Sequence, residues 1–137
     1  RAHAAAAGSA GATVRFEVAD ACAVRLPEQD VVTLFFPFLT VHACLAWGAP
    51  LSRLRPRRLL RRAVGALRPG GWLVVVNQTT AEHARLSRLL RGLPVERVAR
   101  RSFASDLLPA AEAAASVGRV GSLWRRRETV PHIPPRG

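Results

Sequence analysis

The stretch Leu67-Arg68-Pro69-Gly70-Gly71-Trp72-Leu73-Val74-Val75-Val76 decides the fold of this 137-residue chain. Proline and glycine end a helix and supply a turn, and the unbroken apolar run that follows is typical of a strand buried on both faces. Upstream, residues 56–67 carry apolar side chains at helical spacing, with arginines on the other side. The chain therefore contains a helix, a tight turn and a buried strand in direct succession.

Further strands and helices alternate around this unit. Residues 13–19 alternate weakly, which predicts a strand. Residues 30–36 form a second continuous apolar run, as expected of a parallel strand covered on both faces. Thr79 and Glu82 fit a capping box that begins a helix. The order of elements predicts an α/β fold with an open, doubly wound (Rossmann-like), mostly parallel sheet and right-handed crossovers. Three more elements complete the prediction: a strand at 95–100, a helix at 102–115 and a strand at 117–124.

We expect one partial α/β domain over residues 1–127, followed by a flexible tail at 128–137. The chain begins with Arg1, contains no methionine and opens in an alanine tract that looks like the end of a helix. These features predict a fragment whose sheet is incomplete on its N-terminal side.

The net charge of +12 comes from arginine alone, because the chain has no lysine. A basic surface attracts polyanions whatever their sequence. Tyrosine and methionine are also absent, while alanine, arginine, glycine and proline abound, which is typical of a GC-rich coding sequence. Part of the charge therefore reflects codon usage, and a solvated arginine surface competes with a polyanion site as its explanation.

Cysteine and histidine usage argues against a disulfide framework and a structural zinc site. Cys22 and Cys44 lie far apart and form no C-x-x-C pair, so we expect reduced, buried thiols. No trio of His, Cys or carboxylates has metal-ligand spacing, so no metal is expected. Three histidines are expected at the surface: His3, His83 and His132.

The longest apolar stretch, residues 31–47, is too short and too interrupted to span a bilayer. No signal pattern precedes it. We therefore expect a soluble cytoplasmic protein without a membrane partner.

Three segments together resemble class I S-adenosylmethionine-dependent methyltransferases. Asp20-Ala21 after a strand, Asp30-Val31-Val32 opening the next, and the Pro69-Gly70-Gly71 turn before a third occur in the order and at the spacing of that family. The resemblance covers about residues 1–125. It implies an S-adenosylmethionine cofactor and methyl transfer to an acceptor that we expect to be a small molecule.

In that family the acidic residue after the third strand accepts a hydrogen bond from the adenine amino group, and the next residue helps to read the ring edge. The matching positions are Asp20 and Ala21, with Cys22 adjacent. A structural alternative is that Asp20 caps the following turn, as aspartate often does where a strand meets a loop. The sequence leaves both interpretations open.

The fourth strand of the family ends beside the methyl donor and the substrate. Here the strand ends Phe36-Pro37-Phe38, which keeps a proline and aromatics but lacks the Asp or Asn of the amino-methylating branches. A base amino group is therefore a less suitable acceptor. The resemblance assigns Phe36 to the cofactor side, and Pro37 and Phe38 to the substrate side. Aromatic rings here either hold a sulfonium through cation–π contacts or simply pack in the core.

The catalytic candidates are His42 and Asn77. Asn77 and Gln78 end a strand at the carboxyl edge, where ligands bind in open α/β sheets, so their amides orient a substrate or cap a turn. His42 is a candidate general base, although methyl transfer from a sulfonium depends mainly on alignment. The glycine-rich loop and the acidic residue that organise the family's cofactor site are both missing from this sequence.

Two alternatives stand beside the methyltransferase prediction. One is a basic nucleic-acid-binding module that uses the helix at 57–68 together with Arg53 and Arg55. The other is a non-catalytic remnant of the same fold, because Gly8-Ser9-Ala10-Gly11 lacks the strand-loop-helix context of a cofactor loop. We expect enzymatic activity only when a glycine-loop segment completes the domain.

Overall fold

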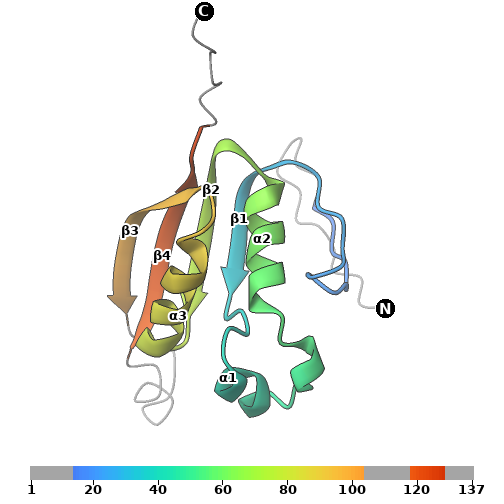
Figure 1. Ribbon diagram of the computed structural model, residues 1–137. Helices are drawn as coiled ribbons and strands as arrows, with labels where there is room; N and C mark the ends of the chain where they lie inside the picture. The colour runs from blue at the N-terminus through green and yellow to red at the C-terminus, as the bar shows by residue number, and fades with distance from the viewer. Residues whose placement is uncertain (1–13, 104–117, 129–137) are drawn as a thin grey trace, which may run out of the picture.

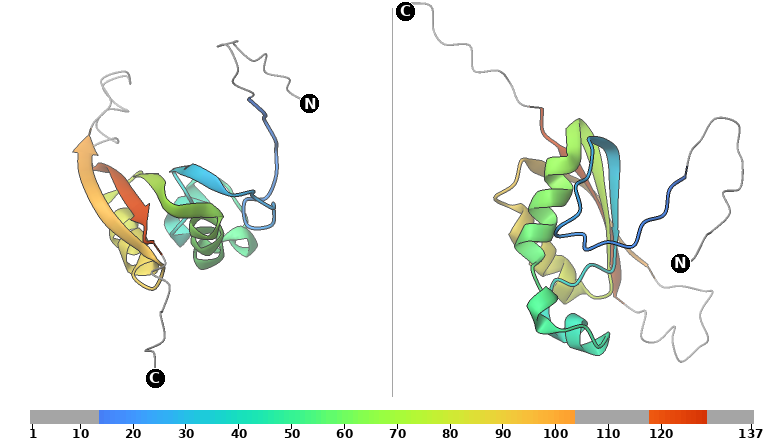
Figure 2. Two further views of the ribbon diagram at one scale, coloured as in Figure 1. Left: turned by 90° about the horizontal axis from the view of Figure 1, so that it is seen from above. Right: turned by 90° about the vertical axis from the view of Figure 1, so that its right-hand side faces the viewer.

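The computed structural model describes residues 14–103 and 118–128 of the chain. These residues form one open four-stranded sheet with helices packed against one face (Figure 1 and Figure 2). The strands are β1 (Gln29–Phe35), β2 (Leu67–Asn77), β3 (Val95–Phe103) and β4 (Arg119–Arg126). The helices are α1 (Val41–Ala46), α2 (Pro56–Ala66) and α3 (Thr80–Leu90), with a 3₁₀ turn at Leu51–Arg53. The predicted open α/β fold is confirmed.

The strands lie in the order β1-β2-β4-β3. β1 pairs with β2 in parallel, and β4 pairs antiparallel with both β2 and β3. Three strands therefore run in one direction and β4 runs in the other. The parallel pair needs a crossover connection, which α2 supplies. As a result the carboxyl ends of β1 and β2 meet at the same edge of the sheet (Figure 1).

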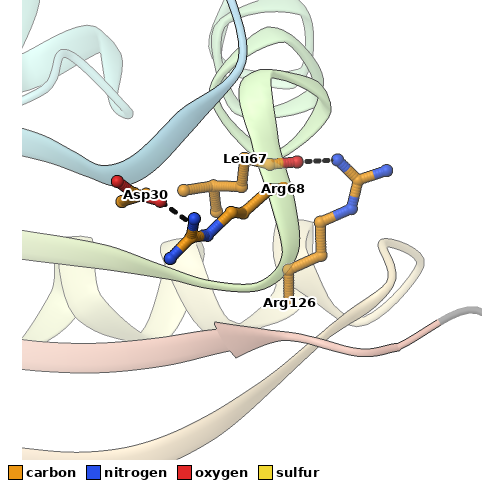
Figure 3. Close-up of polar contacts among 4 residues, drawn as sticks. All are labelled: Asp30, Leu67, Arg68 and Arg126. Atoms are coloured by element: carbon orange, nitrogen blue, oxygen red, sulfur yellow. Dashed lines mark hydrogen bonds and ion pairs between the residues drawn. The ribbon is translucent and has the colours of Figure 1, made fainter.

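Helix α2 passes into β2 without a loop, because Ala66 ends the helix and Leu67 begins the strand. The guanidinium of Arg126 on β4 donates to the carbonyl oxygens of Val64 at 3.3 Å and Gly65 at 3.2 Å. It also donates to the carbonyl oxygen of Leu67 (Figure 3). The carbonyl oxygen of Val64 also accepts the N–H of Leu67. Arg126 thus adds hydrogen bonds at the end of the helix and ties α2 to the antiparallel strand.

The backbone of the Pro69-Gly70-Gly71 segment explains why positions 70 and 71 are glycine. Gly70 has a φ of +76°, in the left-handed region that favours glycine. A Cβ on Gly71 would lie 2.9 Å from the carbonyl oxygen of Arg68 and 3.0 Å from that of Asp30 on β1. Glycine therefore lets the start of β2 approach β1 closely, where the parallel register shifts.

An ion pair lies beside this close approach. Nε of Arg68 is 2.5 Å from Oδ1 of Asp30 (Figure 3). Because the two side chains are 58% and 65% exposed, the pair contributes at most about 1 kcal/mol to stability. The fit of the glycines therefore matters more than the charges in joining β1 to β2.

One hydrophobic core lies between the helices and the sheet. Its buried residues are Leu39, Leu60, Ala63, Val64, Leu67, Leu73, Val75, Leu86, Leu90, Val95 and Trp124. The opposite face of the sheet carries half-buried Trp72, Val74 and Val76, and exposed Val31 and Phe35. In the described ranges, helices cover only one of the two faces (Figure 2).

Two predictions about strands are wrong. Residues 14–19, predicted as a strand, lie outside the sheet, with Phe16 and Val18 exposed. Their weak alternation finds no partner among the described strands, and a strand is stable only when its backbone pairs. β1 forms, but within the described ranges it is an edge strand with one face uncovered rather than a strand covered on both faces.

The helix starts follow their capping residues. The hydroxyl of Thr79 accepts the N–H of Glu82 at 3.1 Å, and the Glu82 carboxylate accepts the N–H of Gln78 at 2.9 Å. The predicted start of α3 is thus confirmed. The short α1 was not predicted, although its first turn is capped in the same way by Thr40, which accepts the N–H of Ala43.

Several other predictions have a structural outcome. Ser102 and Phe103 continue β3, so the helix predicted at 102–115 is wrong at its start, and the rest of it lies outside the described residues, as does the tail from 129. Cys22 and Cys44 are buried free thiols, as predicted. Among the described residues, no three His, Cys, Asp or Glu side chains gather as metal ligands, and no helix has the length and apolarity of a membrane span.

His83 was predicted at the surface, and this is wrong. It is 5% exposed on the inner face of α3, and neither ring nitrogen has a hydrogen-bond partner in the described part of the chain. Burial lowers the pKa of His83 below its ordinary value of 6.5, and repulsion from Arg100 and then Arg97 lowers it further. The folded protein therefore accommodates the neutral imidazole.

Replacing Gly71 by alanine should lower the free energy of unfolding by about 1 to 3 kcal/mol, because the new Cβ would press on two backbone oxygens. Gly65→Ala is the matched control. Nothing lies within 4 Å of a Cβ at that helical position, so this change should stabilise the protein by about 0.5 to 1 kcal/mol. Urea unfolding followed by circular dichroism measures both, and equal effects would contradict the close approach.

The free energy of unfolding should also fall as the pH drops below 6.5. At that pH the unfolded state binds a proton at His83, whereas the folded state, with its lowered pKa, does not yet bind it. The lowered pKa means that this contribution is present above pH 6.5 and is lost as the pH falls through the folded-state pKa. The slope is at most about 1.4 kcal/mol per pH unit. His83→Gln should flatten the profile in urea titrations from pH 7 to about 5. An unflattened profile would exclude His83 as the source.

Candidate functional site

Residues 20–24 form a tight turn ahead of β1. Oδ1 of Asp20 accepts the N–H of Cys22 at 2.8 Å, and the carbonyl oxygen of Asp20 accepts the N–H groups of Ala23 and Val24, both at 2.8 Å. Asp20 therefore caps its own turn, which is the structural alternative for this residue. Only one of its two carboxylate oxygens is engaged within residues 14–103 and 118–128, and the residue is exposed.

Two arginines of α2 hold this turn in place. Nε of Arg58 donates to the carbonyl oxygen of Cys22 at 2.9 Å, and Arg62 donates to the carbonyl oxygens of Ala23 and Val24. Hydrogen bonds from a charged donor contribute about 1.5 to 3 kcal/mol each when well shielded. These bonds explain why a segment that belongs to no strand has a defined place beside α2.

The backbone turns sharply where β1 ends. Phe36 has a φ of +49°, the one positive value at a non-glycine residue of the described ranges. Its N–H donates to the carbonyl oxygen of Val76 at 2.8 Å, and its ring lies 5.3 Å from the guanidinium carbon of Arg119. A bulky residue in the left-handed region is strained, and such strain clusters at ligand sites. The carboxyl end of β1 is therefore a candidate site on backbone geometry alone.

Two adjoining cavities lie at this edge. The first, of about 420 Å³, is bordered by the Asp20 turn, and the second, of about 530 Å³, by the end of β1. Ala21, Phe38 and Leu59 line both, so the two cavities are contiguous. Their volumes lie within the range of about 300 to 1,000 Å³ that small-molecule sites occupy.

Six of the residues predicted from the sequence line these cavities. They are Asp20 and Cys22 at the first cavity, Phe36 and Pro37 at the second, and Ala21 and Phe38 at both. The structure does not bring His42 or Asn77 to them. His42 is exposed on α1, and the side chain of Asn77 is fully buried, with neither amide atom hydrogen-bonded in the described part of the chain.

Trp47, Arg53 and Arg55 are among the lining residues that were not assigned to this site from the sequence. Trp47 follows α1, and its ring centroid lies 6.5 Å from that of Phe38 with the planes tilted by 53°. Arg53 and Arg55 border the first cavity together with Asp20. The capping threonine before α1 was the available signal for a helix in this segment, and that helix ends at its C-cap residue Trp47.

The fold resembles solved structures of longer proteins. The [4+2]-cyclase SpnF matches with a TM-score of 0.57 and 16% identity over 83% of this chain. A chain from the complex between the Haloferax volcanii Trm112 methyltransferase activator and a putative methyltransferase matches with a TM-score of 0.58 and 16% identity over 85% of this chain. The chain has a class I methyltransferase-like fold.

The chain spans 56% and 63% of the two structures that it matches. At 16% identity the likeness shows the fold and not the reaction, and one of the two proteins is a cyclase by name. No protein family model and no curated protein matches the sequence. The features that bear on function are therefore the two cavities and the residues that line them.

Proposed function

We propose that this chain provides the adenine side and much of the acceptor side of an S-adenosylmethionine-dependent methyltransferase site for a small-molecule acceptor. The observation that supports this most is the convergence of two separate triplets, Asp20-Ala21-Cys22 and Phe36-Pro37-Phe38, on contiguous cavities. Both triplets were assigned to that role from the resemblance of the sequence. The cavities lie at the carboxyl edge of the parallel pair, where open α/β sheets bind ligands.

The first cavity suits an adenine ring. Ala21, Phe38 and Leu59 provide apolar walls for a flat heterocycle. The carboxylate oxygen of Asp20 that the turn does not use is an acceptor for an exocyclic amino group. Capping the turn and reading adenine are therefore compatible roles, since they use different oxygens of one carboxylate.

The second cavity suits the reacting groups. Its walls include the aromatic side chains Phe35, Phe36, Phe38 and Trp47. S-adenosylmethionine supplies a methyl group activated by a positively charged sulfur, and aromatic faces attract such a cation. No titratable side chain is among the described residues that line this cavity, so they act by aligning the acceptor and excluding water. This favours an acceptor that is nucleophilic without a protein base.

The proposal is tested by calorimetric titration of S-adenosylhomocysteine and of adenosine into the chain. Asp20→Asn keeps an oxygen that caps the turn but replaces the free acceptor oxygen with an amide NH₂. It should weaken binding of both ligands about tenfold or more, as expected for a lost hydrogen bond to a charged group. The thermal midpoint should stay close to that of the unsubstituted chain.

Asp30→Asn is the matched control, because it removes the same charge at the amino end of β1, away from both cavities. It should leave ligand binding unchanged. Equal ligand binding by Asp20→Asn and Asp30→Asn would contradict a role of Asp20 in binding adenine. No binding of either ligand by the unsubstituted chain would favour the non-catalytic scaffold.

A further inference from the structure

The helix layer carries a groove lined with arginine. A cavity of about 360 Å³ between α2 and α3 is bordered by Arg57, Arg61 and Arg88. A second cavity, of about 470 Å³, is bordered by Arg85 and again by Arg88, so the two adjoin. We call the pair the arginine groove. It shares no lining residue with the candidate cofactor cavities.

The groove has no acidic counterpart in the described part of the chain. No Asp or Glu lines either cavity. The ion pairs among the described residues lie elsewhere, between Arg15 and Glu17 and between Arg68 and Asp30. Like charges three or four residues apart on a helix repel and raise the free energy of the folded state. A bound anion relieves that repulsion, and a ligand that binds the folded state stabilises it.

The other arginines of α2 are already engaged, which sets the groove apart from a uniformly solvated surface. Arg58 and Arg62 donate to the carbonyl oxygens of the 20–24 turn. Arg57 and Arg61 lie one helical turn apart, and no hydrogen bond joins their side chains to the rest of the described structure. Codon usage accounts for the number of arginines, but it does not account for their gathering from two helices into one acid-free groove.

We propose that the arginine groove binds adjacent phosphoryl groups, from a free oligophosphate or from a nucleic-acid backbone. The planar guanidinium offers paired donors that match two phosphate oxygens at once. Leu89 and Leu93 add aliphatic side chains to the lining, and a Cβ at Gly92 would have nothing within 4 Å. No aromatic side chain lines either cavity, so a base finds no stacking surface. The groove therefore recognises phosphates without regard to base sequence.

Two probes test the proposal. Inorganic tripolyphosphate is titrated by calorimetry, and a fluorescein-labelled oligothymidylate of about 12 nucleotides by anisotropy. The groove variant is R61Q/R88Q. The control variant is R68Q/R101Q, which removes the same charge at exposed positions outside the groove. All four side chains are exposed, and circular dichroism melts check that both variants fold.

We expect the groove variant to raise the dissociation constant about tenfold or more, because it loses charge-assisted hydrogen bonds to the phosphates, and the control variant to raise it less than about twofold. For the oligothymidylate, the logarithm of the association constant falls as the logarithm of the salt concentration rises. In the groove variant this negative slope should become shallower by about 1.4, because two phosphate contacts on a single strand are lost.

Competition between the probes assigns the source of the phosphates. Tighter binding of the oligothymidylate, displaced by tripolyphosphate, assigns a nucleic-acid backbone, and binding of tripolyphosphate alone assigns a free oligophosphate. Equal weakening by the groove and control variants would overturn the proposal, because the charge then acts as a diffuse field. The absence of saturable binding to either probe would overturn it as well.

Discussion

The parallel pairing of β1 with β2 determines where α2 and the candidate site lie. A parallel pair needs a crossover, and α2 provides it with no spare residue at its end, since Ala66 and Leu67 are adjacent. Leu67 is fully buried, and Arg126 donates hydrogen bonds to the carbonyl oxygens at the helix end. The absence of a Cβ at Gly71 lets the two strands meet. Helix α2, the 69–71 turn and β2 therefore form one packed unit. The candidate site lies at the opposite end of this unit, where β1 and β2 end.

The candidate site follows from that unit. Because β1 and β2 end at the same edge, Phe36 can donate its N–H to Val76 and adopt its strained backbone there. The 20–24 turn reaches the same edge through α2, whose Arg58 and Arg62 hold its carbonyl oxygens. One helix thus both creates the parallel pair and docks the turn that carries Asp20. The shape of the cavities therefore depends on the packing of α2.

The central elements were predictable because their signals are local. A helical stripe, a proline-glycine turn and an apolar run determine α2 and β2 whatever surrounds them. The failure at 14–19 has a different cause, since alternation reports the preference of a segment and not the presence of a strand to pair with it. His83 was open to prediction, because it lies three and seven residues before Leu86 and Leu90 on the buried face of α3.

Several residues that line the two cavities were named from the sequence, but the geometry of the cavities was not. The resemblance named Asp20 and Phe38, yet it gave no sign that the turn is held by arginine rather than by a preceding strand. The net charge of +12 was uninformative as a sum. The structure divides it into arginines that bind carbonyl oxygens, such as Arg58 and Arg126, and arginines that line a groove, such as Arg57. Arginine suits the first role because its planar group offers several fixed donors.

The most direct test of a cofactor site at the carboxyl edge of β1 is a ¹H–¹⁵N NMR titration of the labelled chain with S-adenosylhomocysteine. The proposed site predicts saturable amide shifts concentrated at Ala21, Cys22, Phe36 and Phe38, on both triplets that line the cavities. Amides that border the arginine groove, such as that of Leu89, should not move. Shifts confined to the groove, or no shifts at either triplet, would contradict the assignment of the cavities.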